Sequence, residues 1–591
     1  MKGFFNRILW IDLTNRKYHT EEIDDNDLKR TLGGKGLATR LLLERNPEGV
    51  EPFSPANLFI LALGPVSDTR IFGSSRYGLY TKSPQTGYYS ESYSGGHVAE
   101  YMSRTGYDAF ILEGAAEEPV YLEIREQGVF FHNAKHLWGR DTYETEDMIK
   151  SELGESRTGI ISIGPAGENL VTCAVVENNY WRSAGRTGAG AVLGSKKVKA
   201  LAFYGEKKRE VADPDGLEEL VRKFKALGKD NKGVEAYRNF GTPMMVRLTN
   251  SLGAFPTKYW HEGSLEGWEN LSAERMQDQL KPKPKACSRC FMACGKFSEV
   301  QDGRHKGLKI EGPEYETIYA FGGLCLIKDL REIAYLNDIC DRLGLDTITA
   351  GNLCAFAMEA SAMENIPEKV PYGDPDTVAS LLKDIAGVRG LGRILSKGIR
   401  HAAREWNMDE VAIHVKGLEP AGYDPRCLKG MALAYATSPR GACHLRTTFY
   451  KAEVSGLLDG KDIREQVSIF LDFEERLALH DMLIVCRFYR DLYPWEELSR
   501  IIYVTTGMDL DKNALSTMAS SVLDSTRIYN IREGLSNTDD HLPNRFFDEP
   551  IGEHKETLDR STFEHSLKEY YRQRKWSEKG IPSQAPFLPQ D

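Results

Sequence analysis

The chain has 591 residues, of which 41% are hydrophobic and 27% are charged. This length corresponds to several domains of roughly 150 residues each, which excludes a small peptide-binding module, and the apolar content excludes a disordered chain. The 76 Lys and Arg against 86 Asp and Glu give a formal net charge of -10, which disfavours generic binding to nucleic acid or anionic lipid.

The N-terminal segment carries Lys2 and Arg7, as a signal peptide would, but its apolar run at 8–11 is interrupted by Asp12. No run approaches the roughly 18 to 20 apolar residues of a membrane-spanning helix. We therefore expect a cytoplasmic protein without a membrane span. Ten cysteines are too few for a disulfide framework in so long a chain, and their clustering indicates metal binding in a reducing compartment.

The N-terminal region is predicted to form strands and turns. Short apolar or alternating runs occur at 58–63, 109–112, 120–124 and 159–163, separated by Gly, Pro, Ser and Asp. We find no repeat of fixed period. The charged segment GEKKREVADPDG at 205–216 contains Pro214 and is predicted to end a β-rich N-terminal domain, 1–205.

Beyond this segment the pattern becomes helical. Six apolar residues have the three- and four-residue spacing of one buried helix face: Ile463, Val467, Phe470, Leu471, Phe473 and Leu477. A second boundary is expected near 411–420, where the stretch KGLEPAGYDP follows a helical run. The sequence thus predicts an α+β multidomain protein in which two mainly α-helical domains, 206–412 and 413–591, follow the β-rich domain.

A cysteine cluster lies in the segment ACSRCFMACGK, where Cys287, Cys290 and Cys294 form a CxxCxxxC run. Three thiolates so close in sequence can converge on one metal centre, and an iron–sulfur cubane takes four. The fourth ligand is predicted to be Cys486, which follows a helical segment. A tetrahedral zinc site is the alternative, although zinc sites usually have two CxxC pairs. Five further cysteines are interpreted as core thiols: Cys173, Cys340, Cys354, Cys427 and Cys443.

The stretch RSAGRTGAGAVLGSKK at 182–197 combines glycines with basic side chains. Glycines such as Gly185 allow a close backbone approach, and four basic residues supply charge for an anionic ligand such as a phosphate: Arg182, Arg186, Lys196 and Lys197. Tight packing of a turn is the alternative. The stretch lacks the GKS or GKT of a Walker loop, and no clear strand, helix and acidic residue complete a dinucleotide fingerprint.

Over nearly its whole length, the chain resembles the aldehyde ferredoxin oxidoreductases, which hold tungsten between two pterin dithiolenes beside a four-iron cluster. The landmarks, in family order, are GPVSDTRIFGSSRYGLYTKSPQTG, SGG, GYDAFILEG, SIGPAGENL, RSAGRTGAGAVLGSK, CSRCFMAC, EGPEYETIYAFG, DRLGLDTITAG, YDPRCLKGMALAYATSPRGACH, the segment 481–486 and YNIREGLSNTDDHLPNRF. The resemblance implies that the β-rich domain has two sheets that cradle the pterins.

The resemblance assigns the four cysteines chosen above, Cys486 among them, to a 4Fe–4S cluster. Four residues of DRLGLD match one of two pterin-binding motifs, in which a carboxylate accepts hydrogen bonds from the pterin ring amine: Asp341, Gly344, Leu345 and Asp346. Asp481 opens the second motif. There the usual glycine is replaced by Ile484, which leaves the backbone geometry of that motif open.

Other positions match residues around the cofactor: Arg76, Gly95, Arg182 and Gly185. In the family, main-chain carbonyls at the positions of Tyr93 and Ser183, where Asn and Ala are usual, help bind a magnesium that joins the two pterin phosphates. A main-chain ligand survives a change of side chain, so we expect Mg²⁺ here too, in a cavity reshaped by Tyr93.

Glu316 in PEYET and His444 in RGACH match the family's active-site pair. Oxidation of an aldehyde to an acid adds a water oxygen and removes two electrons, which needs a base for the water and a donor to the carbonyl. The resemblance implies that Glu316 is the base and His444 the donor. Without it, they would be interpreted as a helix-surface carboxylate and a core histidine.

Two features depart from the family pattern. Some members bridge dimer subunits through an iron held by ExxH, but the matching stretch YLND at 335–338 offers no such pair, so that iron is expected to be absent. Cys325 stands where an apolar residue is common. It could approach the metal as a ligand, as one cysteine does in the tungsten benzoyl-CoA reductases, or be a core thiol.

We therefore expect an enzyme that oxidises an aldehyde at a tungsten or molybdenum bispterin centre and passes electrons through the cluster to ferredoxin or another small carrier. Alternatives are a relative acting on an aromatic acyl thioester, a sugar phosphate or a carboxylic acid, a noncatalytic iron–sulfur carrier, and a zinc scaffold. A homodimer or a partner subunit is compatible with the sequence. The segment LKPKPK, with Lys281, Lys283 and Lys285, could dock an acidic ferredoxin or be a solvated linker.

Overall fold

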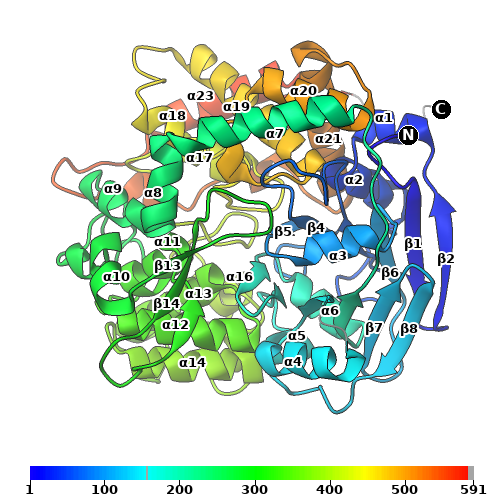
Figure 1. Cartoon of the computed structure of the whole chain (residues 1–591). Helices are drawn as coiled ribbons and strands as arrows, with labels where there is room; N and C mark the ends of the chain where they lie inside the picture. The colour runs from blue at the N-terminus through cyan, green and yellow to red at the C-terminus, as the bar shows by residue number, and fades with distance from the viewer. Residues whose placement is uncertain (155–156, 584–586, 588–591) are drawn as a thin grey trace.

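The computed structural model describes residues 1–154, 157–583 and 587. Two six-stranded sheets make up the N-terminal part, and mainly helical regions follow (Figure 1). The predicted fold class is confirmed. In the described part of the chain, no helix is long and apolar enough to cross a membrane.

The two sheets are formed by strands that follow one another along the chain. The first sheet has the order β2-β1-β6-β3-β4-β5, from β1 (Arg7–Asp12), β2 (Lys17–Glu22), β3 (Phe59–Ala62), β4 (Tyr77–Lys82), β5 (Tyr89–Ser94) and β6 (Ala109–Glu113). The second has the order β11-β10-β9-β12-β7-β8, from β7 (Val120–Arg125), β8 (Gly128–Asn133), β9 (Gly159–Ser162), β10 (Val176–Asn178), β11 (Arg182–Ala184) and β12 (Val198–Phe203). The four apolar runs predicted as strands form β3, β6, β7 and β9.

The second sheet repeats the topology of the first. β1 is antiparallel to β2 and parallel to β6, as β7 is to β8 and β12. β3 lies antiparallel between β6 and β4, as β9 lies between β12 and β10. The N-terminal part is therefore a structural duplication, which the search for a repeat of fixed period missed. A Gly-Pro pair after the third strand of each copy, at 64–65 and 164–165, is the signal that could have indicated it.

Alternate side chains along the strands enter different cores. Leu9 and Ile11 of β1 pack with the second sheet, whereas Ile8 and Trp10 pack with helices. The helices of that outer core include α2 (Gly34–Arg45), α19 (Ile463–Leu483), α20 (Trp495–Thr506) and α21 (Lys512–Arg532). Because the sheet is covered on both faces, its strands β3 and β6 are apolar runs, whereas the edge strand β2 is polar and exposed.

The helical half has its own core, formed mainly by α12 (Leu330–Leu343), α13 (Thr347–Ala362), α14 (Pro375–Gly387) and α17 (Gly430–Thr437). The other long helices are α4 (Thr142–Leu153), α7 (Pro214–Lys229), α8 (Lys232–Phe240), α10 (Ala273–Leu280) and α23 (Arg560–Gln573). The predicted helix face at 463–477 belongs to α19, where Val467, Phe470 and Leu477 are buried. A capping box of Asp462 and Glu465 begins this helix.

Glycines let each copy of the duplication approach a helix end of the helical half. A Cβ on Gly64 would lie 2.0 Å from the carbonyl oxygen of Leu483, the last residue of α19. A Cβ on Gly164 would lie 2.3 Å from that of Leu343, the last residue of α12. Each Gly-Pro segment thus packs directly on the turn that carries one of the two motifs predicted to bind a pterin.

Candidate active site

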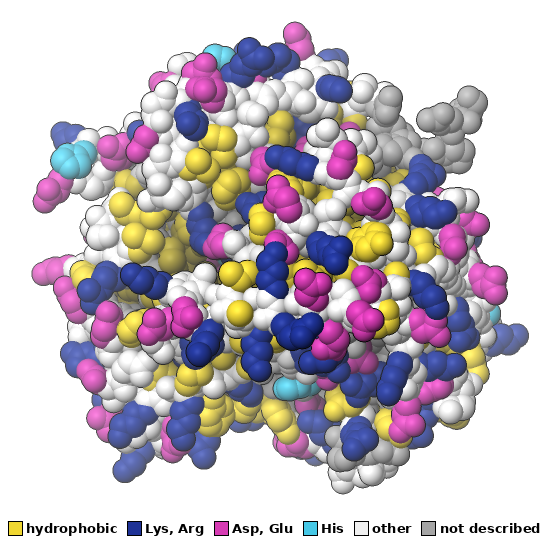
Figure 2. All heavy atoms as spheres, turned by 45° about the horizontal axis from the view of Figure 1, so that its top comes forward, with side chains coloured by type: hydrophobic (Ala, Val, Ile, Leu, Met, Phe, Trp, Pro, Cys, Tyr) yellow, Lys and Arg dark blue, Asp and Glu magenta, His cyan; other side chains and the backbone are white. Residues whose placement is uncertain are grey.

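Two adjoining cavities of about 310 and 380 Å³ are lined by both the N-terminal sheets and the helical half. Arg76, Tyr93, Glu316 and Cys486 are among the residues that line both, so the two spaces meet. On the left of Figure 2 the surface is hollowed over the region where α8 and α18 (Tyr450–Val454) lie in Figure 1, and hydrophobic side chains line the hollow. Residues of both helices belong to the second cavity.

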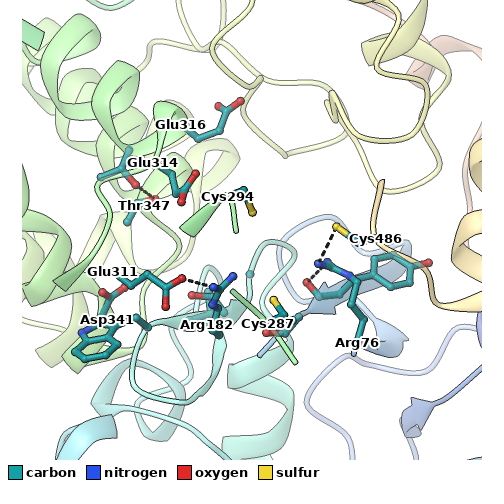
Figure 3. Close-up of a pocket in the computed structure, with 18 of the residues that line it drawn as sticks. Arg76, Arg182, Cys287, Cys294, Glu311, Glu314, Glu316, Asp341, Thr347 and Cys486 are labelled. Atoms are coloured by element: carbon teal, nitrogen blue, oxygen red, sulfur yellow. Dashed lines mark hydrogen bonds and ion pairs between the residues drawn. The ribbon is translucent and has the colours of Figure 1, made fainter. Parts of the chain in front are cut away.

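The four cysteines predicted as cluster ligands line the first cavity. Cys287, Cys290 and Cys294 come from the loop between β13 (Lys283–Lys285) and β14 (Gly295–Glu299). Cys486 comes from the turn after α19. Figure 3 shows three of these thiols, with Arg76 and Arg182 among them. The fold therefore gathers around one space cysteines that are far apart in the sequence.

The wall of this cavity approaches the sulfur atoms closely. The N–H of Gly96 donates to Cys287 Sγ at 3.2 Å, and a Cβ on Gly95 would lie 2.8 Å from that sulfur. Burial raises the pKa of the Cys290 and Cys294 thiols. Thiolates at these positions therefore need a nearby positive charge, which bound iron would supply.

Within the described residues, no group of three or more His, Cys, Asp or Glu side chains could hold a single metal ion. A tetrahedral zinc would require all four sulfurs at about 2.3 Å from one point. The four thiols line one cavity, and an iron–sulfur cubane takes four thiolate ligands.

The first predicted pterin motif lies between α12 and α13. Asp341 is in the last turn of α12 and accepts a hydrogen bond from Asn337 at 2.7 Å; Gly344 ends the helix with φ 75°. Asp346 caps the N-terminus of α13 through two main-chain N–H groups. Asp341, Leu345 and Asp346 line the first cavity, while Gly344 forms the turn behind them. Burial, with a neighbouring carboxylate, raises the pKa of Asp341.

The second predicted motif ends α19 and lies at the second cavity. The Asp481 carboxylate accepts hydrogen bonds from Arg446, at 2.9 Å, and from Arg487. Ile484 takes the left-handed conformation that Gly344 has in the first motif. The loss of the glycine therefore leaves the turn intact, which answers the question that the sequence left open.

Asp481 belongs to a buried network of charges that the sequence did not reveal. Glu91 of β5 lies 3.0 Å from Lys35 and 2.6 Å from Arg446, and all three side chains are buried. Burial opposes ionisation of Glu91, but the charges of Arg446 and Lys35 hold its pKa below the usual range. Nε and Nη2 of Arg446 have no partner in the described structure. These donors at the cavity wall are suited to an anionic cofactor.

The residues predicted to hold magnesium lie on corresponding edge strands of the two sheets. Tyr93 is in β5 and Ser183 in β11, and both line both cavities. Arg76 donates to the main-chain carbonyl of Tyr93 at 3.2 Å, and its Nη1 lies 3.9 Å from Cys486 Sγ. Arg182 pairs with Glu311 at the first cavity. The duplication thus brings one candidate carbonyl from each sheet to the same space.

Not every basic residue of 182–197 reaches a cavity. Arg182 and Gly185 line the first cavity, and Arg186 lines the second. Lys196 instead donates to two main-chain carbonyls at 3.0 Å, away from both cavities, and Lys197 donates to a third. These two lysines fix the chain and do not serve a ligand in the cavities.

Glu316 and His444 meet in the second cavity. Oε1 of Glu316 lies 3.4 Å from Nε2 of His444, and its Oε2 accepts a hydrogen bond from the N–H of Gly422 at 3.0 Å. Burial raises the pKa of Glu316 to about 8, and burial together with Arg186 lowers that of His444. These shifts favour a protonated Glu316 and a neutral imidazole at neutral pH.

Glu316 lies on α11 (Tyr315–Thr317), which continues into a π-helical segment, Ile318–Leu324. Such segments often accompany functional sites. Cys325 ends this segment, where it is fully buried, and its thiol donates to the carbonyl of Gly351 at 3.4 Å. It lines neither cavity, so the structure places it among the core thiols.

Cys443, interpreted from sequence as a plain core thiol, has a different environment. Its sulfur is fully buried and accepts hydrogen bonds from Arg440 at 3.0 and 3.3 Å and from the N–H of Leu445 at 3.4 Å. Burial opposes ionisation, but Arg440, Arg446 and Arg186 lower the pKa of Cys443 to about 6. Three guanidinium groups therefore favour the ionised form of Cys443, which precedes His444 in the chain.

Comparison with known proteins gives matches along almost the whole chain. Models of the aldehyde ferredoxin oxidoreductase N-terminal domain and of its domains 2 and 3 match residues 8–205 and 219–587. The chain is 33% identical to the tungsten-containing aldehyde ferredoxin oxidoreductase of Pyrococcus furiosus, covering 99% of this chain and 98% of that one. It is 34% identical to the enzyme of the same name from Thermococcus kodakarensis, covering 98% and 97%.

More distant relatives have other activities in their names. The WOR-like subunit of an aliphatic sulfonate oxidoreductase from Pyrococcus furiosus is 26% identical, with 99% of this chain and 96% of that one covered. Among solved structures, the active-site complex BamBC of benzoyl coenzyme A reductase superposes with a TM-score of 0.85 at 24% identity, covering 98% and 96%. At this identity, the match shows that the two proteins share a fold.

Proposed function

The chain belongs to the aldehyde ferredoxin oxidoreductase family, and from this premise we propose that it oxidises an aldehyde to a carboxylate at a tungsten or molybdenum bispterin centre. Electrons would leave singly through a 4Fe–4S cluster to a ferredoxin. Membership of this family supports the conclusion that the protein is an oxidoreductase. The observation that carries the aldehyde reaction is the buried Glu316–His444 pair, 3.4 Å apart at the wall of the second cavity.

The residues present fit the cofactors. Cys287, Cys290, Cys294 and Cys486 would hold the cluster. Asp341 lines the first cavity and Asp481 the second, and each would accept hydrogen bonds from one pterin. The unpartnered donors of Arg446, which lines the second cavity, would bind anionic groups of the cofactor. The carbonyls of Tyr93 and Ser183 would bind Mg²⁺, which prefers oxygen ligands. When bound, the metal centre supplies the acceptor for two electrons.

The side chains account for the protons of the reaction. An aldehyde and one water yield a carboxylate, three protons and two electrons. Glu316 is proposed to remove a proton from the water, and its pKa of about 8 lets it take up and release that proton near neutrality. His444 is neutral, so one ring N–H can donate to the aldehyde oxygen and polarise the carbonyl.

The relative named for aliphatic sulfonate supports a second candidate, an oxidoreductase of the same family acting on another substrate. Two measurements on the purified holoenzyme test the proposal. Metal analysis should give four irons and one tungsten or molybdenum per chain, and added aldehydes should reduce a dye acceptor. Zinc without either heavy metal would contradict the proposal, as would a fully loaded protein that oxidises no aldehyde.

A further inference from the structure

The second cavity contains a buried guanidinium whose hydrogen-bonding capacity is only partly used. Arg490 is 2% exposed and lines this cavity. Its Nη1 donates to the carbonyl of Arg487 at 2.9 Å, but Nε and Nη2 have no hydrogen-bond partner in the described structure. Burying a charge without a partner is costly, so such a site is stabilised by a ligand that accepts from it.

The groups packed around Arg490 leave an excess of positive charge. Asp491 is the carboxylate that faces it, with Oδ1 4.0 Å from Nε, but the Asp491 side chain is 62% exposed and pairs with Lys451 at 2.5 Å. Arg476 of α19 donates to the Arg490 carbonyl at 3.0 Å, and its own Nε is unpartnered. Arg490, Arg476 and Lys451 therefore share two carboxylates that are not buried, Asp491 and Asp472, and Asp472 also pairs with Lys512 at 3.0 Å. This balance favours an additional anion.

Two phenols lie beside this guanidinium. Tyr237 of α8 and Tyr450 of α18 line the second cavity. Both phenols interact electrostatically with Arg490: burial opposes its charge, while Tyr450, Tyr237 and Asp491 raise its pKa. A carboxylate can accept from a guanidinium and from phenolic O–H groups at once.

An aromatic wall separates this polar end from the reacting pair. The rings of His444 and Tyr423 have centroids 5.5 Å apart, and those of Tyr423 and Tyr450 are stacked at 4.3 Å. Tyr237 in turn stacks on Phe488 at 4.6 Å, and both line the cavity. A ligand that reached from His444 to Arg490 would thus pass along the apolar faces of the Tyr423 and Tyr450 rings.

The polar end is distinct from the part assigned to the cofactor. Of the residues that line the second cavity, Asp481 and Arg446 are assigned to the cofactor, whereas Arg490 and Tyr450 belong to neither pterin motif nor the predicted magnesium site. We infer that Arg490, with the hydroxyls of Tyr237 and Tyr450, binds a carboxylate at the far end of the substrate. The substrate class is then an aldehyde with an apolar middle and a terminal carboxylate, an inference that rests on the proposed function.

A chain-length series tests this directly. The holoenzyme is assayed with ω-oxo acids of increasing length and with n-alkanals of matched length. At the best length the acid should have a kcat/KM roughly ten- to a hundredfold higher than the matched alkanal, mainly through KM, as a hydrogen-bonded charge pair provides. A ratio near one at every length would overturn the inference.

Variants then assign the preference to Arg490. Arg490→Gln should remove most of the acid-to-alkanal ratio, and Arg490→Lys should keep part of it. Tyr450→Phe is a smaller change, and it can be used if Arg490→Gln does not fold. It should lower the same acid-to-alkanal ratio. Arg247→Gln is the matched control, since Arg247 of α9 (Met245–Ser251) is 62% exposed and lines neither cavity. A ratio that persists in both cavity variants would overturn the inference.

Binding separates this inference from the proposed function. Titration calorimetry of the holoenzyme with the dicarboxylate of the best length should show binding that Arg490→Gln weakens by a similar factor. Such binding in a protein that oxidises no aldehyde would support the anion site and reject the proposed function. Oxidation of alkanals by a protein that does not bind the dicarboxylate would support the proposed function and reject the anion site.

Discussion

Ile484 ends α19 in the same left-handed conformation in which Gly344 ends α12. The backbone angles are φ 56° and ψ 47° at Ile484 and φ 75° and ψ 49° at Gly344. In each turn the next residue also donates its N–H back to the helix: Val485 to the His480 carbonyl at 2.8 Å and Leu345 to that of Cys340 at 2.9 Å. A β-branched residue in this region costs about 1 to 2 kcal/mol, so the surrounding packing must hold the second turn in place.

Gly34, at the start of α2, is part of that packing. A Cβ on Gly34 would lie 2.5 Å from the carbonyl oxygens of Asp481 and Met482, and the residue has φ 42°. We therefore expect Gly34→Ala to destabilise the protein by roughly 3 kcal/mol or more and to weaken retention of the cofactor, because backbone atoms must shift. Denaturant unfolding and metal content measure the two effects.

A glycine in an ordinary helix provides the control. Gly233→Ala in α8 places a Cβ 3.1 Å from Oδ1 of Asn231, the side chain that caps this helix, so that a shift of a few tenths of an ångström suffices. Its unfolding midpoint should change little. Equal midpoints for Gly34→Ala and the wild type would show that the end of α19 is not held by this contact.

Cys486→Ala should abolish the cluster, although Cys486 lies far in sequence from the other three candidate ligands. It lines the first cavity with them, and a cubane corner without a thiolate is labile. Iron content and the low-temperature spin signal of the reduced protein measure the loss. Cys427→Ala is the control, because Cys427 lines neither cavity. A full, stable four-iron cluster in the Cys486 variant would remove this residue from the ligand set.

Glu316→Gln should leave iron and the heavy metal bound but reduce turnover by the ~10²- to 10⁴-fold typical of a lost general base. The amide keeps the shape and the hydrogen bond from Gly422, but it cannot accept a proton from water. Steady-state kinetics on metal-replete protein measure the effect. Near-normal aldehyde oxidation would exclude Glu316 as the base.

The raised pKa of Glu316 predicts two pH dependences. As the base must be ionised, kcat/KM should rise with pH and level off above about 8. For stability the sign is opposite. The folded-state pKa lies above the ordinary value of 4.5, so the folded protein binds more protons between these values, and stability falls as pH rises from 4.5 to about 8.

Paired unfolding measurements isolate this contribution. Between pH 5 and pH 8, the wild type should lose stability relative to Glu316→Gln, which has no group to titrate at this position. A difference between the two proteins that does not change with pH would contradict the raised pKa.

Local pattern was sufficient for part of this structure. The four apolar runs form strands, and the spacing from Ile463 to Leu477 forms α19, because each depends on neighbours in sequence. The pairing of Glu91 with Lys35 and Arg446 could not be predicted, since it joins a strand, a helix and a loop that meet only in the folded chain. The unpartnered donors of Arg490 could not be predicted either, because only the folded structure shows that this side chain is buried.

The segment LKPKPK, predicted to dock a ferredoxin or to be a solvated linker, offers fewer free charges than its sequence indicated. Lys285 is half-buried: its Nζ lies 4.2 Å from the centre of the Trp181 ring and 3.3 Å from Glu311. It therefore supports the wall of the first cavity. Lys281 and Lys283 are exposed, and they remain as charges that an acidic partner could meet.

Reversal of these two lysines tests whether electrons leave at this face. Lys281→Glu with Lys283→Glu should slow the reduction of an acidic ferredoxin, most strongly at low salt, because attraction between exposed charges raises the association rate and is screened beyond about 10 Å at 0.1 M salt. Reduction of a neutral dye should change little, since its encounter does not depend on this charge. The control reverses Lys17 and Lys29, two exposed lysines of β2 and α1 (Asp25–Thr31), which gives the same change in net charge away from the cluster loop. Two outcomes would show that the carrier docks on another face. In one, the Lys281→Glu, Lys283→Glu variant reduces ferredoxin at the wild-type rate at low ionic strength. In the other, the control variant is slowed as much as this variant.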